Sequence, residues 1–224
     1  MCGRFVQAQS PRAYASHFGA EVAGEDSPSP SWNVAPTRKV GVVLERDGRR
    51  LFAPLRWGLI PGYAKDPSIG SRLINARAET LAEKPTFKGA LRTRRCMVPA
   101  DGFYEWERRE TGGKLPHYVH SADGTPLALA GLWGRWRAPD GELIDSFTIV
   151  TTRPNAVLAP IHDRMPAILP PENWEAWLDP GFDDVEALTA MLAPATEGSL
   201  TEHPVSTLVN RVENDFPRCV APLE

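Results

Sequence analysis

The chain has 224 residues, of which 42% are hydrophobic and 24% are charged, and this composition is typical of a folded globular protein. No apolar run approaches the roughly 20 residues needed to span a bilayer, and no secretory signal is recognisable at the start. The three cysteines, Cys2, Cys96 and Cys219, are far apart, so they predict neither a zinc site nor a disulfide framework. We therefore expect a cytoplasmic protein without a membrane segment, metal or cofactor.

The net charge of −3 conceals an asymmetry between the two halves of the chain. Residues 1–112 hold 18 Lys and Arg against 12 Asp and Glu, whereas residues 113–224 hold 7 against 16. A basic half is compatible with phosphate binding, because clustered cations release counterions from a nucleic acid backbone. Uneven surface charge without a function gives the same counts, so composition leaves both interpretations open.

The first elements expected along the chain are a short helix, a loop and a hairpin. Ser10-Pro11 predicts a helix start, because serine caps a helix and proline suits its first turn. Residues 21–32 are predicted to form an exposed loop. Residues 39–60 read as a β-hairpin that turns at Asp47-Gly48, a dipeptide suited to a tight primed turn.

Strands are expected to dominate the middle of the chain. Residues 76–84 contain good helix formers and predict a helix. Residues 95–110 predict two strands joined by a turn at Asp101-Gly102, and residues 126–136 and 146–152 predict two more, because they are rich in β-branched and aromatic residues. Residues 170–179 and 182–193 then predict a pair of helices, the second with acidic residues in its first turn.

Cys2 follows the initiator methionine and becomes the first residue if Met1 is removed. An α-amine has a pKa of about 7.7–8.0, so a useful fraction is a neutral nucleophile near pH 7. Amines attack aldehydes to give Schiff bases, and an adjacent thiol can then close onto the imine carbon as a thiazolidine ring. Only an N-terminal cysteine offers both groups in a protein. Taken alone, Cys2 is equally explained as an incidental small residue without a catalytic role.

One polar pair and one carboxyl group in the middle of the chain could carry chemistry. In LINARAE, Asn75 and Arg77 are two residues apart, so an extended backbone projects both to one side, where they suit a phosphate-bearing ligand. A helix cap and a solvated arginine explain the same spacing. Glu105 lies between Tyr104 and Trp106, and partial desolvation would raise its pKa and suit it to proton transfer. An ordinary ion pair is the alternative.

Three further segments carry polar and aromatic groups in predicted loops. PIHDRMP, bounded by prolines, places His162 two residues before Arg164, and a histidine there is either a general acid or base or a structural residue. WNVAPT and the loop around Tyr63 interleave aromatic and cationic residues, which can stack bases and hold phosphates or form ordinary surface.

In this order, MCGRF, WNVAPT, RWGLIP to LINARAET, CMVPADGFYEW, IHDRMP and VNRVENDFPRC resemble the SRAP family, the SOS-response-associated peptidases, understood as abasic-site processing proteins. The resemblance runs from residue 1 to about residue 222. It implies an α+β fold in one domain over residues 1–224, with a curved, barrel-like, mostly antiparallel β core and flanking helices. It also implies a monomer that binds single-stranded DNA, or a single- to double-strand junction, containing an abasic site, in association with the nucleoid at damaged DNA.

The family attaches to the abasic sugar through its N-terminal cysteine, so the resemblance implies a thiazolidine crosslink that shields the site from strand cleavage. Where some relatives carry tryptophan, this chain has Tyr63, whose ring can also stack. The implied catalytic residues are Cys2, Asn75, Glu105 and His162. The implied DNA-binding residues are Arg4, Trp32, Asn33, Pro36, Tyr63, Arg77, Thr151 and Arg164. A cysteine-type peptidase that removes its own Met1, or a non-catalytic single-strand binding module, are the alternatives.

Overall fold

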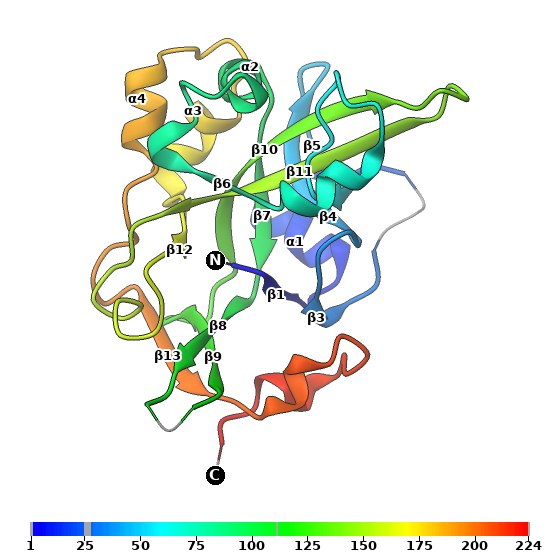
Figure 1. Ribbon diagram of the computed structural model, residues 1–224. Coiled ribbons are helices and arrows are strands. Elements are labelled where there is room, and N and C mark those ends of the chain that lie inside the picture. The colour runs from blue at the N-terminus through cyan, green and yellow to red at the C-terminus, as the bar shows by residue number, and fades with distance from the viewer. Residues whose placement is uncertain (1, 25–27, 111, 224) are drawn as a thin grey trace.

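The computed structural model describes residues 2–24, 28–110 and 112–223, which form two β-sheets with short helices around them (Figure 1). The larger sheet contains β2 (Glu21–Val22), β4 (Lys39–Arg46), β5 (Arg49–Trp57), β6 (Asn75–Arg77), β7 (Arg95–Ala100), β10 (Leu127–Arg137), β11 (Leu143–Thr152) and β12 (Met165–Pro166). The smaller sheet contains β1 (Arg4–Gln7), β3 (Ser31–Val34), β8 (Gly102–Arg108), β9 (Lys114–Ser121) and β13 (Leu200–Pro204). The α-helices are α1 (Pro11–His17), α2 (Pro85–Thr93), α3 (Trp174–Leu178) and α4 (Val185–Ala190), and the 3₁₀ turns are η1 (Pro67–Arg72), η2 (Ala78–Thr80), η3 (Pro171–Asn173), η4 (Thr207–Asn210) and η5 (Pro217–Val220).

Five strands of the larger sheet close into a barrel. β11, β10, β7, β4 and β5 are antiparallel neighbours in that order. β5 then returns to β11 in parallel, with Arg56 opposite Ser146 and Trp57 opposite Phe147. Closure removes the free strand edges of these five strands. The predicted α+β fold with a curved, barrel-like, mostly antiparallel core is therefore confirmed.

The barrel wall has an apolar core on each of its two faces, as the side chains of β7 show. All of its residues are buried, and successive side chains of a strand point to opposite faces. Cys96 and Val98 belong to the buried cluster that includes Trp57, whereas Met97 belongs to the cluster that includes Leu91 of α2. The barrel thus has one apolar core inside and a second one under the helices, which makes it a rigid support for the residues attached to its strands.

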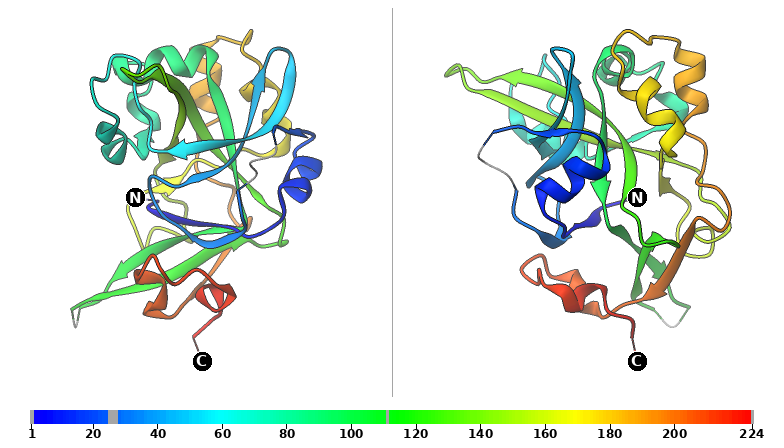
Figure 2. Two further views of the ribbon diagram at one scale, coloured as in Figure 1. Left: turned by 90° about the vertical axis from the view of Figure 1, so that its right-hand side faces the viewer. Right: turned by 180° about the vertical axis from the view of Figure 1, so that it is seen from behind.

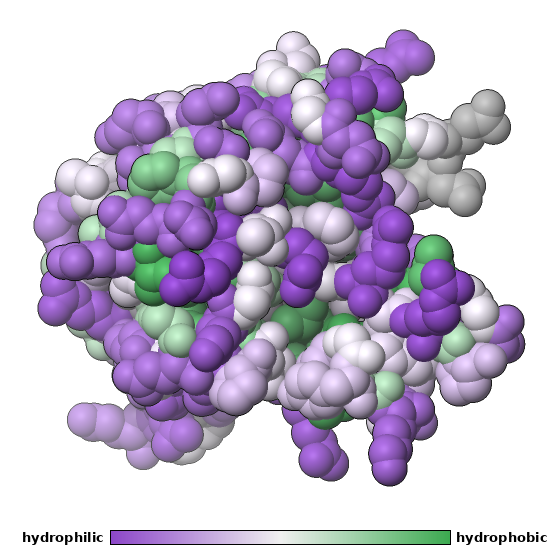
Figure 3. Space-filling model, turned by 90° about the horizontal axis from the view of Figure 1, so that it is seen from above, coloured by the Kyte–Doolittle hydropathy of each residue, from purple (hydrophilic) through white to green (hydrophobic). Residues whose placement is uncertain are grey.

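The helices and the two chain ends take different places around the sheets. α2, α3 and α4 gather at one end of the molecule, and the C-terminal segment 205–223 lies at the opposite end (Figures 1 and 2). The end that carries α2 and α4 has a mainly hydrophilic surface, interrupted by small apolar areas (Figure 3). The chain start lies between these ends. No helix of the described ranges is both long and apolar enough to cross a membrane.

Where local sequence decides the structure, the predictions are confirmed. The hairpin of β4 and β5 turns at Asp47 and Gly48, both with positive φ (55° and 70°), as a primed turn requires. Ser10 caps α1, because its Oγ accepts a hydrogen bond of 3.2 Å from the backbone N–H of Ala13. The strands expected at 126–136 and 146–152 are β10 and β11, and the helices expected at 170–179 and 182–193 are η3 with α3 and a shorter α4.

Two predictions are wrong because pairing across the fold decides the structure. Residues 76–84 do not form a helix: they continue β6, which pairs in parallel with β11, and then η2, while α2 begins only at Pro85. Residues 21–32 are not all loop, since β2 pairs with β5 and β3 begins at Ser31. Residues 25–27 of that segment lie outside the described ranges.

The turn predicted at Asp101-Gly102 joins two sheets rather than two paired strands. β7 belongs to the larger sheet and β8 to the smaller one. The carboxylate of Asp101 accepts hydrogen bonds of 2.7 Å from the backbone N–H of Ala8 and from the hydroxyl of Tyr14. This bend therefore ties β8 to α1 and brings the smaller sheet, in which β1 lies between β8 and β3, against the barrel.

Candidate active site

The N-terminal cysteine lies at the start of β1, next to β8. The two strands are antiparallel, with Arg4 opposite Tyr104, and continuing this register by one residue places Gly3 opposite Glu105. Cys2 and Glu105 therefore come together. Cys2 has no exposed surface. Burial raises the pKa of its thiol, and the nearby Glu105 carboxylate raises this pKa further.

Asn75 reaches the cysteine from the barrel. It is the first residue of β6, which pairs in parallel with β11 through Ile149. Its side-chain Nδ2 donates a hydrogen bond of 2.8 Å to the backbone carbonyl of Cys2. Its Oδ1 is buried and accepts no hydrogen bond from the described residues. A buried polar atom without a partner is costly, and this oxygen can still accept a hydrogen bond.

Glu105 is a buried carboxyl group on β8, with 2% of its surface exposed. Burial raises its pKa to about 7, and the charge of Asp163 acts in the same direction. Near neutral pH the side chain is thus present both as a carboxylate and as a carboxylic acid. A group in this state can accept a proton in one step and return it in the next.

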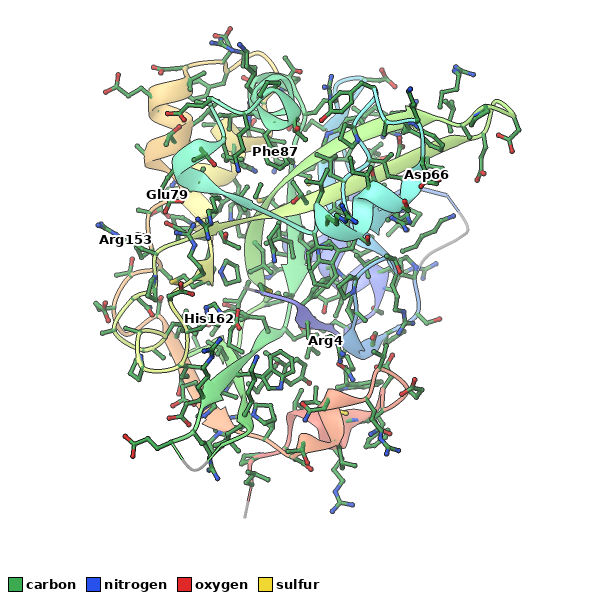
Figure 4. The ribbon with its side chains drawn as sticks, in the orientation of Figure 1. Arg4, Asp66, Glu79, Phe87, Arg153 and His162 are labelled. Atoms are coloured by element: carbon green, nitrogen blue, oxygen red, sulfur yellow. The ribbon has the colours of Figure 1, made fainter. Side chains whose placement is uncertain are left out.

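His162 lies in the loop that precedes β12, and Figure 4 shows it beside the start of β1. Its Nδ1 accepts the backbone N–H of Arg164 at 3.0 Å, so the neutral ring carries its proton on Nε2. Asp163 Oδ1, 2.9 Å from the same nitrogen, pairs with it only in the doubly protonated ring. Burial lowers the pKa of His162, which Asp163 opposes and Lys114 and Arg108 reinforce. The ring is therefore mainly neutral at pH 7.

Arg77, Thr151 and Arg164 lie next to one another on the far side of Asn75. Arg77 is exposed and stands opposite the buried Thr151 in the pairing of β6 with β11. Arg164 donates to the Thr151 carbonyl at 2.5 Å and forms a bidentate ion pair with Glu79, at 2.7 and 2.9 Å. Arg77 thus presents an available cation, whereas a phosphate has to compete with Glu79 for Arg164.

Arg4 and Asn33 hold the C-terminal segment in this structure. Asn33 is fully buried, and its Oδ1 accepts a hydrogen bond of 2.7 Å from Arg4. Its amide group donates to the backbone carbonyls of Val209, Arg211 and Asn214. Arg4 also donates to the Val209 carbonyl, at 2.9 Å. A direct contact between Asn33 and DNA would require this side chain to be exposed, so its place here is that of a support for β1.

The three remaining predicted DNA contacts differ in exposure. Trp32 on β3 and Pro36 in the following loop are half-buried. Tyr63 is 67% exposed, yet its hydroxyl forms a hydrogen bond of 2.8 Å with Thr86 Oγ1, which fixes the ring at the surface. The structure therefore brings Cys2 and Glu105 together with the other two predicted catalytic residues, and spreads the predicted DNA contacts over a wider surface around them.

Comparison with known families decides the classification. A family model described as SOS response associated peptidase (SRAP) matches residues 1–212. The chain belongs to the SRAP family. It is 39% identical over 221 residues to abasic site processing protein YoqW of Bacillus subtilis, which covers 98% of this chain and 99% of that protein. It is 36% identical over 227 residues to abasic site processing protein HMCES of Gallus gallus, covering 87% of this chain and 67% of that protein.

Solved structures share the SRAP fold described above. A protein from Bacteroides thetaiotaomicron superposes over 100% of both chains with a TM-score of 0.89 and 26% sequence identity. A protein from Bordetella bronchiseptica covers 92% of this chain with a TM-score of 0.77 and 27% identity. The arrangement of the barrel and the smaller sheet is therefore common to these chains.

Two residues of this SRAP site were not predicted from the sequence. Glu79 forms an ion pair with the guanidinium of Arg164. Asp215 accepts hydrogen bonds from Ser31 Oγ and the backbone N–H of Trp32, at 2.8 and 2.6 Å. Both partners lie far away in sequence, so no local spacing points to them. Within the described ranges, no cluster of three or more His, Cys, Asp or Glu side chains could hold a metal ion.

Proposed function

We propose that this chain processes abasic sites in single-stranded DNA by forming a thiazolidine crosslink through Cys2. The observation that carries the proposal is a group of three residues: the Asn75 amide donates to the carbonyl of buried Cys2, and buried Glu105, with a pKa of about 7, lies beside the thiol. The names of YoqW and HMCES, abasic site processing proteins, support the same substrate. The reaction requires removal of Met1, which lies outside the described residues.

The first step opens the closed hemiacetal of the abasic sugar. In its minor, doubly protonated form, His162 bonds to Asp163 through Nδ1–H and gives its Nε2 proton to O4′ as the C1′–O4′ bond breaks. The proton of the C1′ hydroxyl passes to the Glu105 carboxylate, and an aldehyde results. Loss of this proton leaves the ring neutral, the form that its lowered pKa favours at pH 7.

The second step forms the Schiff base. The neutral α-amine of Cys2 attacks C1′, and a proton moves from nitrogen to oxygen to give a carbinolamine. Protonated Glu105 then gives its proton to the hydroxyl group, which leaves as water while the iminium ion forms. Asn75 orients this group, because its Nδ2 holds the Cys2 backbone and its Oδ1 is available to accept from the amine or from a sugar hydroxyl.

The third step closes the ring. The Glu105 carboxylate takes the proton of the Cys2 thiol, and the sulfur attacks C1′ so that the iminium nitrogen becomes a neutral secondary amine. The buried thiol has a raised pKa and is not ionised by itself, so a base within reach is required. One aldehyde and one aminothiol give one thiazolidine and one water. Ring closure removes the iminium, which otherwise promotes β-elimination and strand cleavage.

The DNA strand is held by groups around this centre. In this proposal Arg77 binds a phosphate next to the abasic sugar and the Tyr63 ring stacks on a base, and the exposure of both side chains supports these roles. Arg164 binds phosphate in exchange for its pair with Glu79, while Thr151 supports its guanidinium. Arg4 and Asn33 act by fixing β1, and Trp32 and Pro36 extend the surface next to it.

A cysteine-type peptidase, as the family description reads, would use the thiol itself as the nucleophile, for instance to remove Met1. Nucleophilic thiols have a lowered pKa, whereas burial raises that of Cys2, so we place the amine chemistry first. A non-catalytic single-strand binding module would use the same DNA contacts without a covalent bond.

A denaturing gel tests the proposal. Protein with a mature Cys2 terminus is incubated with single-stranded DNA that contains one abasic site, and with matched undamaged DNA. A band that survives denaturation, requires the abasic site and disappears with Cys2→Ala supports crosslinking. Absence of this band from the mature wild-type protein refutes it. Cleavage of a peptide panel would favour the peptidase, and salt-sensitive binding alone the binding module.

A further inference from the structure

A turn of residues 155–162, between β11 and β12, carries His162. The backbone carbonyl of Asn155 accepts the N–H of Ala159 at 2.9 Å, and the carbonyl of Leu158 accepts the N–H of His162, also at 2.9 Å. The segment is therefore held by hydrogen bonds along its length. The place of the His162 ring beside β1 depends on the conformation of this turn (Figure 4).

The side chain of Asn155 starts the turn from a buried position. Only 5% of Asn155 is exposed. Its Oδ1 accepts the backbone N–H of Leu158 at 3.2 Å, in the way that an asparagine caps the first turn of a helix. Its Nδ2 donates to the backbone carbonyl of Ala195 at 3.4 Å. Both ends of this buried amide therefore have a partner, as a buried polar group requires.

Two further contacts fix the turn in place. Leu158 has no exposed surface and belongs to the buried cluster that includes Cys2. The N–H of Ala156 donates to the Glu197 carboxylate at 3.1 Å. Glu197 belongs to the segment between α4 and β13, which runs beside the turn in Figure 1. The turn is thus anchored on one side in the core beside Cys2 and on the other side in this segment.

Two hydrogen bonds in series lead from Asn155 to His162. Asn155 Oδ1 holds the N–H of Leu158, and the carbonyl of Leu158 holds the N–H of His162. Loss of the first bond leaves the backbone around Leu158 free to rotate, so the second bond loses its alignment. A catalytic group misplaced by about 1 Å can lose about 100-fold in rate. The two side-chain bonds of Asn155 end on backbone groups, so an effect on the chemistry has to pass through the turn.

We propose that Asn155 is a positioning residue, which fixes the turn that holds the His162 ring beside Cys2. The catalytic role of His162 rests on the proposed function, whereas placement of its ring by Asn155 does not. Asn155 acts through His162 and takes no part in bond formation at Cys2.

The direct test reads the His162 ring by ¹⁵N NMR and needs no DNA. In the wild type, Nδ1 accepts the N–H of Arg164, so the neutral ring should carry its proton on Nε2. In Asn155→Ala the turn loosens and both tautomers should be present. Unchanged ¹⁵N resonances of His162 in folded Asn155→Ala would overturn the proposal. If Asn155→Ala does not fold, Asn155→Gln takes its place, since it keeps the amide but is one methylene too long for the cap.

A conservative variant should restore the ring. Asn155→Ser retains a cap oxygen, because serine is as good a cap residue as asparagine, and it adds no charge next to Glu197. We expect the wild-type tautomer in this variant. The tautomer mixture of Asn155→Ala, if it persisted in Asn155→Ser, would show that the bond to Leu158 does not set the ring.

A double-mutant cycle gives the kinetic test, with saturating single-stranded DNA that contains one abasic site. Asn155→Ala alone should crosslink about 10- to 100-fold more slowly. In a His162→Ala background it should change the rate by less than about twofold, because the group that it positions is absent. The same loss in both backgrounds would overturn the proposal.

The matched control removes a cap elsewhere in the molecule. Asp184 caps α4 by accepting the N–H groups of Glu186 and Ala187, at 3.0 and 3.1 Å. Asp184→Ala should leave the crosslinking rate unchanged. Equal slowing in Asp184→Ala and Asn155→Ala would reduce the effect of Asn155 to a general loss of stability.

Acetaldehyde separates this proposal from the proposed function. It is an open aldehyde, so its thiazolidine with mature Cys2 forms without the ring opening assigned to His162. Asn155→Ala should react with it at the wild-type rate, and slower reaction would mean that Asn155 acts on Cys2 itself. If the His162 tautomer depends on Asn155 but the wild type never crosslinks to abasic DNA, the positioning stands and the proposed chemistry falls. If the wild type crosslinks and Asn155→Ala changes neither tautomer nor rate, the chemistry stands and the positioning falls.

Discussion

The side-chain amide of Asn75 donates a 2.8 Å hydrogen bond to the backbone carbonyl of Cys2. This bond joins the barrel, through β6, to the start of β1 in the smaller sheet. It fixes the residue that we propose as the nucleophile without using the nucleophile's own amine or thiol. The barrel therefore positions the chain start, on which the proposed chemistry depends.

Replacing Asn75 should slow crosslinking more than it weakens binding. Asn75→Ala removes both the bond to the Cys2 carbonyl and the buried Oδ1 acceptor. We expect a 10- to 100-fold lower crosslinking rate at saturating DNA, in line with a loss of about 1.4–2.7 kcal/mol. Single-turnover kinetics measure the rate. Binding is measured with single-stranded DNA that carries a tetrahydrofuran abasic analogue, which has no aldehyde and cannot crosslink. An unchanged rate at saturating DNA would remove Asn75 from the reaction.

Glu105 should make both rate and stability depend on pH near 7. The carboxylate form deprotonates the thiol, so the rate of ring closure should fall as pH drops below about 7. Glu105→Gln should be slow at every pH while it still binds DNA. A wild-type rate that is flat between pH 6 and pH 8, and unaffected by this substitution, would contradict the assignment.

The same group gives a stability prediction whose sign follows from the direction of its shift. The pKa is raised from 4.5 to about 7 on folding, so ionisation favours the unfolded chain. The stability that goes with protonated Glu105 is complete below pH 4.5 and is lost as pH rises through 7. Glu105→Gln should therefore unfold with up to about 3 kcal/mol more stability than the wild type at pH 8, and with little difference at pH 4. Denaturant titrations at the two pH values measure this.

Asn33 should contribute to the folding stability of the protein and to the position of β1. Asn33→Ala removes three hydrogen bonds to backbone carbonyls and one acceptor of the Arg4 guanidinium, which costs about 1–3 kcal/mol of unfolding free energy. Asn33→Asp keeps the acceptor for Arg4 but loses both donors, so we expect an intermediate effect. Thermal unfolding ranks the three proteins. If Asn33→Ala weakened DNA binding with unchanged stability, a direct contact with DNA would replace this account.

Arg77 should contribute to DNA binding rather than to chemistry. Arg77→Ala should weaken binding of the tetrahydrofuran analogue at low salt and reduce the slope of log K against log [salt] by about one, as for the loss of one phosphate contact. Arg137→Ala, an exposed arginine at the end of β10, is the matched control. An unchanged slope would show that Arg77 does not bind phosphate.

The sequence predicts those parts of the fold that neighbouring residues decide. Asp47-Gly48 requires positive φ and forms the expected turn, and Ser10 caps the expected helix. Residues 76–84 have a high helix propensity, but their first residues extend β6, which pairs in parallel with β11. That pairing joins segments more than 70 residues apart. Propensity carries no information about such a partner, so the helix prediction fails.

The candidate site shows the same division. The residue types and their order in the chain identify the family, and the resemblance leads to the proposed roles of Cys2, Asn75, Glu105 and His162. The environment of each group depends on contacts between distant segments: Glu105 has a raised pKa because the sheets bury it, and Asn33 is occupied by carbonyls from residues 209–214. Exposure and hydrogen-bond partners of this kind cannot be read from spacing along one strand.

The measurement that tests the central claim most directly is mass spectrometry of the N-terminal peptide after reaction with abasic single-stranded DNA and nuclease digestion. The account predicts an adduct on Cys2 that lacks Met1, has lost one water relative to its two parts, and survives without borohydride. Cys2→Ser should give only a Schiff base that borohydride must trap. An adduct on another residue, or one on Cys2 that borohydride reduces, would contradict the thiazolidine.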